Sequence, residues 1–221
     1  MNDKEFCFII CSNDKLYTKE CLHYINYLIV PKGYQIDILT VEKAKSMTAG
    51  YNEAMQYSKA KYKVYLHQDT FIINQNFIQD CLDIFKNDKK IGMIGNIGAP
   101  KLPTSGIMWE TVRCGKVYEQ HIYETSLVSN PEDEKIKSDF FEVEAIDGFL
   151  MVTQYDICWR EDFFDKWDFY DCSQSMEFIR RGYRVVVPQM KQPWCVHDCG
   201  FVNLQGYEEE RKKFLKEYFE K

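Results

Sequence analysis

Three polar residues directly after a short apolar run are suited to metal or phosphate chemistry. His67, Gln68 and Asp69 follow residues 64–66, whose side-chain types favour a buried strand. If this stretch stays extended, the alternation of side chains along a strand directs His67 and Asp69 the same way. An imidazole and a carboxylate at a strand end are suited to a divalent cation that bridges a diphosphate. A strand that runs into a polar surface loop is the alternative interpretation of the same residues.

Two carboxylates further along the chain each allow two interpretations. Asp147 precedes Gly148 between two apolar halves, and an Asp-Gly pair is typical of a hairpin turn. Asp171 lies near the start of an expected helix, where the helix dipole stabilises a carboxylate and where a capping role would also explain it. The functional alternatives for both residues depend on a family resemblance that is described below.

A second histidine alternates with two cysteines. On one strand Cys195, His197 and Cys199 would share a face, which allows a zinc site. Such a site needs a fourth ligand, for which Cys172 or His67 is a candidate. The lack of thiol pairs at short spacing argues against zinc, so a structural role for His197 is an alternative.

The composition of the 221 residues favours one α/β domain with a large core, because 45% of them are hydrophobic and 15% are aromatic. A formal net charge of −6 argues against a general nucleic-acid-binding protein, which needs a basic surface. No apolar run approaches the ~18 residues of a membrane span, and the first residues lack the apolar core of a signal peptide. Nine cysteines without CxxC pairs then indicate reduced thiols. We expect a cytoplasmic protein without a membrane span.

The elements that would position the polar residues follow from the apolar pattern. Residues 5–11 form a continuous apolar run, which is typical of a central parallel strand. A helix that Thr18 could cap follows, and residues 34–41 indicate a second strand, so a right-handed βαβ unit is predicted. Residues 48–57 predict a short helix, and an amphipathic helix follows with Phe77 on its apolar face and Asn74 as its cap.

The second half of the chain has a weaker pattern. The glycines of residues 91–98 punctuate a strand but lack the GxGxxG spacing of a dinucleotide-binding fold, so a nicotinamide-binding protein is excluded. Residues 99–141 predict a long loop, and loops of this length often form binding surfaces. Residues 207–221 predict a helix with one apolar stripe. We expect this helix to pack on the core or on a second protomer, so a homodimer is a candidate assembly.

Four segments occur in an order that is found in a known family. They are the strand of residues 8–10, the Ala49-Gly50-Tyr51-Asn52-Glu53-Ala54 helix, the Tyr65-Leu66-His67-Gln68-Asp69 strand end and the strand of residues 91–95. In this order they resemble glycosyltransferase family 2, over nearly the whole chain. More narrowly, the chain is similar to the small bacterial transferase-like domain named after a streptomycin-biosynthesis protein. The resemblance implies one GT-A domain with a mixed, mostly parallel central sheet flanked by helices.

The resemblance implies a metal site. In the family, an Asp-x-Asp motif at this strand end holds Mn²⁺ or Mg²⁺ on the diphosphate of a nucleotide-sugar. Asp69 matches the second acid of that motif, whereas His67 replaces the first. His197 matches a histidine after the last core strand that is commonly a further metal contact. The expected ligands are therefore His67, Asp69 and His197, with one carboxylate fewer than the family pattern.

The resemblance also implies catalytic and acceptor residues. The family has a Glu-Asp pair whose Asp deprotonates the acceptor hydroxyl, and this pair reads Tyr170-Asp171 here. Asp171 is therefore the expected base. A similar acidic-Gly segment in the family leads into the acceptor side of the site, which places Asp147 there. Trp109, in the predicted loop, could stack on an acceptor sugar, and packing in the core is the alternative.

On the donor side, the resemblance places Asn52 near the nucleotide pocket, although Tyr51 stands where the family often has a basic residue. Glu42, at the end of the second predicted strand, could contact the nucleoside or could simply be exposed. The expected donor-binding residues are Ser12, Glu42, Asn52, Gln68 and Asp69.

These expectations combine into one functional hypothesis. Residues 1–98 would form the donor-binding half of a single domain, residues 99–204 the acceptor and catalytic half, and residues 205–221 a C-terminal helix. The expected function is hexosyltransferase-like: metal-dependent, inverting transfer of a sugar from a nucleotide-diphosphate sugar to a saccharide or other hydroxyl acceptor. A non-catalytic nucleotide-sugar- or partner-binding module is the first alternative, because the first motif acid is missing. A structural domain held by zinc is the second.

Overall fold

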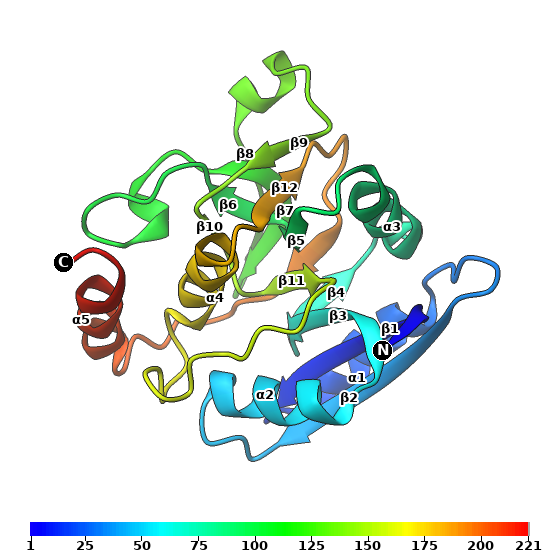
Figure 1. Ribbon diagram of the computed structural model, residues 1–221, viewed down its shortest axis with the longest axis horizontal. Helices are drawn as coiled ribbons and strands as arrows, with labels where there is room; N and C mark the ends of the chain where they lie inside the picture. The colour runs from blue at the N-terminus through cyan, green and yellow to red at the C-terminus, as the bar shows by residue number, and fades with distance from the viewer. Residues whose placement is uncertain (221) are drawn as a thin grey trace.

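The computed structural model describes residues 1–220, in which helices flank a mixed β-sheet (Figure 1). The helices are α1 (Lys15–Asn26), α2 (Met47–Tyr57), α3 (Phe77–Asn87), α4 (Tyr170–Arg180) and α5 (Tyr207–Tyr218), with 3₁₀ turns η1 (Met108–Glu110) and η2 (Pro131–Lys135). The strands are β1 (Asn2–Ser12), β2 (Gln35–Glu42), β3 (Ala60–His67), β4 (Thr70–Ile72), β5 (Ile91–Gly95), β6 (Ile97–Ala99), β7 (Cys114–His121), β8 (Glu124–Ser129), β9 (Phe140–Glu142), β10 (Ala145–Ile146), β11 (Leu150–Thr153), β12 (Arg184–Pro188) and β13 (Cys195–His197).

The central sheet has seven strands within residues 1–220, in the order β2-β1-β3-β11-β5-β12-β9. β1 is parallel to β2 and β3, and β5 is parallel to β12. β11 is antiparallel to both β3 and β5, and β9 is antiparallel to β12. The sheet is therefore mixed and mostly parallel, which confirms the predicted fold class. The carboxyl ends of β1, β2 and β3 meet at one edge, which is where open α/β sheets bind ligands.

The predicted βαβ unit is present, but two helix caps differ from the prediction. α1 begins at Lys15, and Asp14 caps it, because the Asp14 carboxylate accepts from two backbone N–H groups of the first turn at 2.8 and 3.2 Å. Thr18 lies inside the helix, where its hydroxyl donates to the Asp14 carbonyl at 2.6 Å. Asn74 does not cap α3 directly, since the helix begins after Asn76 and the Asn74 Oδ1 accepts from the Asn76 N–H at 3.1 Å.

A second sheet forms where the sequence predicted a long loop. β7 and β8 make an antiparallel hairpin, and β7 also pairs with β6 and β13. β4 and β10 extend this sheet at its two ends. The loop prediction fails because β8 is mostly exposed and has no buried face that an apolar pattern could reveal. The predicted strand of residues 91–98 is also divided at Asn96, since β5 joins the central sheet and β6 joins the second sheet.

The Asp147-Gly148 pair does not form the expected hairpin turn. β10, before the pair, is hydrogen-bonded to β6, whereas β11, after it, lies between β3 and β5. The chain therefore passes from the second sheet to the central sheet at Asp147. This crossing brings a carboxylate to the boundary between the two sheets.

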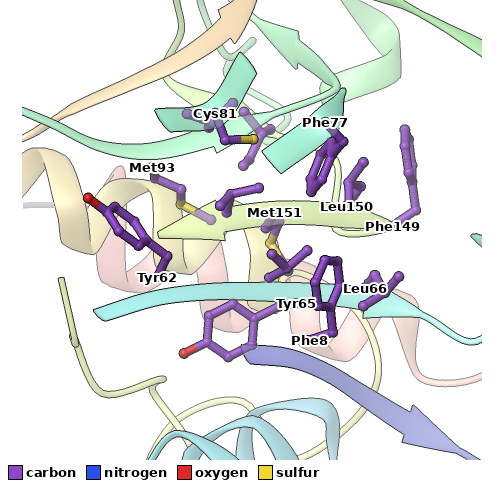
Figure 2. Close-up of a cluster of buried hydrophobic side chains, with 14 of the residues drawn as sticks. Phe8, Tyr62, Tyr65, Leu66, Phe77, Cys81, Met93, Phe149, Leu150 and Met151 are labelled. Carbon is purple, nitrogen blue, oxygen red and sulfur yellow. The ribbon is translucent and has the colours of Figure 1, made fainter. Parts of the chain in front are cut away.

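The part of the core next to the end of β3 lies between the central sheet and α3. Figure 2 shows Phe77 and Cys81 of α3 in one cluster with side chains of β1, β3 and β11. Leu66, the residue before the end of β3, is fully buried in this cluster. Phe149 directly precedes β11 and stacks on His197 with ring centroids 4.7 Å apart. The apolar stripe predicted for α3 is confirmed, and its packing continues up to the polar residues that follow β3.

α5 packs against its own chain beside α4 (Figure 1). Phe214 is fully buried and lies 5.4 Å, centroid to centroid, from the ring of Phe169. The hydroxyls of Tyr218 and Ser173 are 2.8 Å apart and join the two helices. The last predicted helical residue, Lys221, lies outside the described residues. Among residues 1–220 no helix is both long and apolar enough to cross a membrane, and the nine cysteines are free thiols.

Asn52 joins α2 to the segment between β11 and α4. Its side-chain Nδ2 donates to the Trp159 carbonyl at 2.9 Å, and its Oδ1 accepts from the Trp159 N–H at 2.8 Å. Asn52 and Trp159 are 5% and 2% exposed, so water has little access to replace these bonds. Asn52 is therefore a structural clamp between two segments that are far apart in the sequence.

We expect Asn52→Ala to lower the free energy of unfolding by about 2–4 kcal/mol, because it leaves a buried N–H and a buried C=O of Trp159 unpaired. Urea denaturation followed by tryptophan fluorescence measures this change. Gln56→Ala, on the exposed face of the same helix, is the matched control and should change the stability by less than about 0.5 kcal/mol. Equal effects of the two substitutions would show that the clamp does not contribute to stability.

Candidate active site

His67, Asp69 and His197 come together from two strands. His67 ends β3, Asp69 lies in the turn before β4, and His197 ends β13. β13 pairs with β4, and the Asp198 N–H donates to the Asp69 carbonyl at 2.9 Å, so the second sheet brings His197 to the turn. A turn, and not an extended chain, directs His67 and Asp69 to the same point, which corrects the expected geometry. Their ligand atoms lie within 4.8 Å of one another, and residues 1–220 contain no second group of this kind.

The geometry of this His67–Asp69–His197 cluster fits a divalent cation. Asp69 Oδ1 lies 3.9 Å from His67 Nδ1 and 3.6 Å from His197 Nε2. Ligand atoms that are each about 2.1 Å from one cation are about 3–4 Å apart, depending on the angle between them. Asp69 Oδ1 is also buried without a hydrogen-bond partner in the described chain. A carboxylate oxygen in that position is costly unless a cation compensates it.

Burial shifts the pKa values of Asp69 and His197. It raises the pKa of the Asp69 carboxyl, an effect that the nearby His67 opposes. Burial, together with His67 and His121, lowers the pKa of His197 to about 3. The His197 imidazole is therefore neutral at physiological pH and has a free lone pair, as a metal ligand requires.

Contacts outside the cluster orient both imidazoles. His67 Nε2 lies 2.5 Å from the hydroxyl oxygen of Tyr170, the first residue of α4, so Nδ1 is the nitrogen that faces Asp69. Phe149 stacks on the ring of His197. Histidines that bind metals are commonly held in this way by partners of their other ring atoms.

A cavity of about 240 Å³ opens beside the cluster at the carboxyl ends of β1, β2 and β3. Ser12, Gln68 and Asp69, three of the residues predicted to bind the donor, line this first cavity. Gln68 joins the ends of β1 and β3, because its Oε1 accepts from the Asn13 N–H at 2.9 Å. Lys43 also lines the cavity and is the one Lys or Arg among its described lining residues.

Two residues predicted for the donor side do not line the first cavity. Asn52 is buried, and both polar groups of its amide bond Trp159, so its contribution is to hold the fold. Glu42 is exposed at the end of β2, between Val41 and Lys43, which do line the cavity. The direction of these side chains depends on how α2 and β2 pack, which their positions in the sequence do not show.

A second cavity of about 260 Å³ lies next to the cluster. Trp109, Asp147 and Asp171, the residues predicted for the acceptor and for catalysis, all line it. Trp109 is 54% exposed, so packing in the core does not explain it. His67 and Trp167 line both cavities, and the His67–Asp69–His197 cluster therefore lies at their junction.

The two carboxylates of the second cavity have raised pKa values. Asp171 accepts from the Gly148 N–H at 2.9 Å and from the Cys172 N–H at 2.7 Å, yet burial raises the pKa of its carboxyl to about 6. Burial, with the charge of Asp171, raises the pKa of Asp147 to about 7. A carboxylate with a pKa near neutrality is a more effective proton acceptor than an ordinary aspartate.

The zinc interpretation is wrong for the described residues. Cys195 is fully buried within β13, whereas Cys199 lies beyond the end of that strand with its Sγ 3.4 Å from the Gln120 carbonyl oxygen. Cys199 therefore does not share a strand face with Cys195 and His197, and the His67–Asp69–His197 cluster contains neither thiol. The His197 ligand atom lies instead within 4.8 Å of those of His67 and Asp69.

Three residues at the site were not singled out from the sequence. Lys43 lines the first cavity, Trp167 lines both cavities and Tyr170 contacts His67. No local pattern marks Lys43 or Trp167, because each occurs in a loop with no periodicity. The position of Tyr170 next to Asp171 was the one signal that could have indicated its importance.

Solved structures that resemble this fold are glycosyltransferases of GT-A type. TarS from S. aureus, residues 1–349, has a TM-score of 0.59 and 10% identity, and the match covers 93% of this chain and 63% of that one. The mannosyltransferase PcManGT from Pyrobaculum calidifontis, in complex with GDP-Man and Mn²⁺, has a TM-score of 0.61 and 11% identity, covering 98% of this chain and 64% of that one. TarS 1–349 in complex with UDP has a TM-score of 0.57, with 11% identity and coverages of 96% and 65%.

The solved structures show the fold of the chain, and the family match shows its family. The chain spans less than two-thirds of the length of the structures it resembles, and identities near 10% show the shared GT-A fold alone. No curated protein sequence matches the chain. The family described as "Glycosyltransferase like family" matches residues 7–218, which is nearly the whole sequence. The chain therefore belongs to the glycosyltransferase-like family.

Proposed function

We propose that the protein is a metal-dependent glycosyltransferase that moves a hexose from a nucleotide-diphosphate sugar to a hydroxyl acceptor with inversion. One observation carries the proposal: the cluster of His67, Asp69 and His197 lies at the junction of two cavities on a GT-A fold. Such an arrangement lets a diphosphate in one cavity and an acceptor in the other meet at one cation. The free thiols support a cytoplasmic location as part of the proposal.

The first cavity is the proposed donor site. Apart from Trp167, it is lined by residues of the segment 1–98, at and after the strand ends, and the related structures that contain UDP or GDP-Man support a nucleotide-sugar here. Ser12 and Gln68 offer polar groups there, and Lys43 offers a positive charge for an anionic ligand. Residues 99–204 supply most of the second cavity, which is the proposed acceptor site, and α5 supports it through Tyr207.

The proposed metal is Mn²⁺ in preference to Mg²⁺. Two imidazoles and one carboxylate form a softer ligand set than the oxygen ligands that Mg²⁺ favours. A PcManGT structure that contains Mn²⁺ supports the same choice. When bound, the cation would neutralise negative charge on the leaving diphosphate.

Asp171 is the proposed base. In a single displacement, the acceptor hydroxyl would give its proton to the Asp171 carboxylate while its oxygen attacks the anomeric carbon from the side opposite the leaving nucleoside diphosphate. The two backbone N–H groups that Asp171 accepts from hold the carboxylate in position. Asp147, in the same cavity, is placed to bind an acceptor hydroxyl.

The charges of the second cavity narrow the proposed acceptor. Glu119, Asp147, Asp168 and Asp171 line it, and its described lining residues include no Lys or Arg. Carboxylates repel a phosphate group, but they accept hydrogen bonds from hydroxyl and amino groups. We therefore propose a neutral or amino-bearing saccharide, stacked on Trp109 at the rim, as the acceptor.

Donor binding can be tested by thermal denaturation with UDP, GDP, dTDP or CDP, each with Mn²⁺, with Mg²⁺ or with neither. A ligand that binds only the folded protein stabilises it by about 2.7 kcal/mol at a hundredfold excess over Kd. We expect one nucleotide to raise the melting temperature in the presence of Mn²⁺, with a smaller effect of Mg²⁺. Asp69→Ala should abolish the shift, and Asp83→Ala, an exposed carboxylate of α3, should retain it.

The outcomes separate the proposed enzyme from the alternative binding module. If none of the nucleotides changes the melting temperature, with or without metal, the proposed donor site is wrong. Saturable nucleotide binding without sugar transfer to any acceptor would identify a binding module that has kept the GT-A fold.

Turnover should depend on pH through Asp171. Because burial raises its pKa to about 6, the carboxyl becomes protonated as the pH falls through about 6, and kcat should fall with it. Asp171→Asn should lower kcat by about 10²–10⁴-fold at pH 8 and retain Mn²⁺-dependent nucleotide binding. If the residual activity of Asp171→Asn keeps the same decline near pH 6, a different group is the base.

The acceptor proposal predicts a preference among glucose, glucosamine and glucose 6-phosphate. We expect the phosphorylated sugar to have an apparent KM at least about tenfold above that of glucose, because its charge meets four carboxylates. Glucosamine should bind at least as well as glucose. The difference should decrease at high ionic strength, and a preference for glucose 6-phosphate would refute the assignment.

A further inference from the structure

Two departures from the family pattern lie in direct contact with each other. His67 stands in place of the first acid of the Asp-x-Asp motif, and Tyr170 stands in place of the Glu that precedes the base. They are 103 positions apart in the sequence, yet His67 Nε2 and Tyr170 Oη are 2.5 Å apart. Because these two departures from the family pattern share one hydrogen bond, we expect His67 and Tyr170 to act together.

The hydrogen bond determines which nitrogen of His67 faces the cation site. Nε2 is directed at Tyr170, and Nδ1 is directed at Asp69, whose Oδ1 lies 3.9 Å away. A neutral imidazole has one N–H and one lone pair, so a lone pair on Nδ1 requires the proton on Nε2. In that tautomer His67 donates to the Tyr170 oxygen, which accepts.

The surroundings of Tyr170 hold its hydroxyl in place. The residue is 3% exposed, and its ring packs against the rings of Tyr51 and Trp159, with centroid distances of 5.9 and 6.0 Å. Gly148 makes room for it, since a Cβ at that position would lie 2.1 Å from the Tyr170 hydroxyl oxygen. The adjacent Asp171 also bonds the Gly148 N–H, so both residues at the start of α4 hold the same turn.

We propose that Tyr170 is a positioning residue for the metal: its hydroxyl oxygen accepts from His67 Nε2–H and thereby presents the Nδ1 lone pair to the cation. This inference rests on the proposed metal-dependent function, which by itself assigns Tyr170 no part. It gives an explanation of how a histidine serves in place of the motif acid. An aspartate at position 67 would need no such partner, because a carboxylate has lone pairs in both directions.

The test compares Mn²⁺ binding to the wild-type protein, Tyr170→Phe and Tyr51→Phe, measured by electron paramagnetic resonance of free Mn²⁺ at one pH. Tyr170→Phe removes only the hydroxyl and keeps the buried ring. Tyr51→Phe is the matched control, because it removes a buried hydroxyl from the same aromatic cluster that has no hydrogen-bond partner within residues 1–220. We expect Kd to rise by about 10–100-fold in Tyr170→Phe and to stay unchanged in Tyr51→Phe.

A double-mutant cycle separates positioning from packing. In a His67→Asp background, Tyr170→Phe should leave the Mn²⁺ affinity unchanged, because no imidazole tautomer remains to be selected. Co²⁺ bound to the wild type and to Tyr170→Phe should also give different visible absorption bands, which report the ligand geometry. Circular dichroism and melting temperature confirm that each variant is folded.

Three results would overturn the proposal. If Tyr170→Phe binds Mn²⁺ like the wild type while Asp69→Ala does not bind it, the metal site stands and Tyr170 has no positioning role. If Tyr170→Phe weakens binding equally in the His67→Asp background, its effect is on packing. If the wild type does not bind Mn²⁺, the positioning role fails together with the metal dependence, and nucleotide binding without metal then decides what remains of the proposed function.

Discussion

One buried carboxylate sets the geometry of the site. Asp69 Oδ1 lies between two imidazoles without a hydrogen-bond partner in the described chain, and burial raises the pKa of its carboxyl. Such a group is costly, so the backbone around it must be held by other contacts. The β4–β13 pairing and the Asp198 N–H bond to the Asp69 carbonyl supply them. The two cavities then open beside the point where these contacts place the cluster.

The start of α4 connects this point to the rest of the fold. Its first two residues, Tyr170 and Asp171, contact His67 and the Gly148 N–H, so one rigid element carries both the support of the cluster and the proposed base. The helix is held in turn by α5, through Tyr218 and Ser173. The related structures share this fold at identities near 10%, so a GT-A fold tolerates extensive sequence change.

The fold was predictable where burial leaves a pattern. β1, β3 and the apolar face of α3 were recognised because each buries a continuous run or a helical stripe. The second sheet was missed because β8 is exposed and β13 has three residues, so neither shows a period. Strand pairings such as β13 with β7 join segments about eighty residues apart, and no local pattern encodes them. Asn52 was assigned to the donor because a helical position does not reveal which partner its amide meets.

The sequence by itself determined the α/β class and the residue types available for chemistry, because burial periodicity is a local property. The resemblance carried by its ordered motifs indicated the family, the GT-A fold and His67, Asp69 and His197 as one set. Only the tertiary structure decided that a turn brings His67 and Asp69 together and that Cys199 lies apart from Cys195. It also decided that Asp147 and Asp171, whose pKa values are raised, line the same cavity. Those outcomes depend on hydrogen bonds and desolvation between segments separated by tens to more than a hundred residues, and such interactions exist only once the chain is packed.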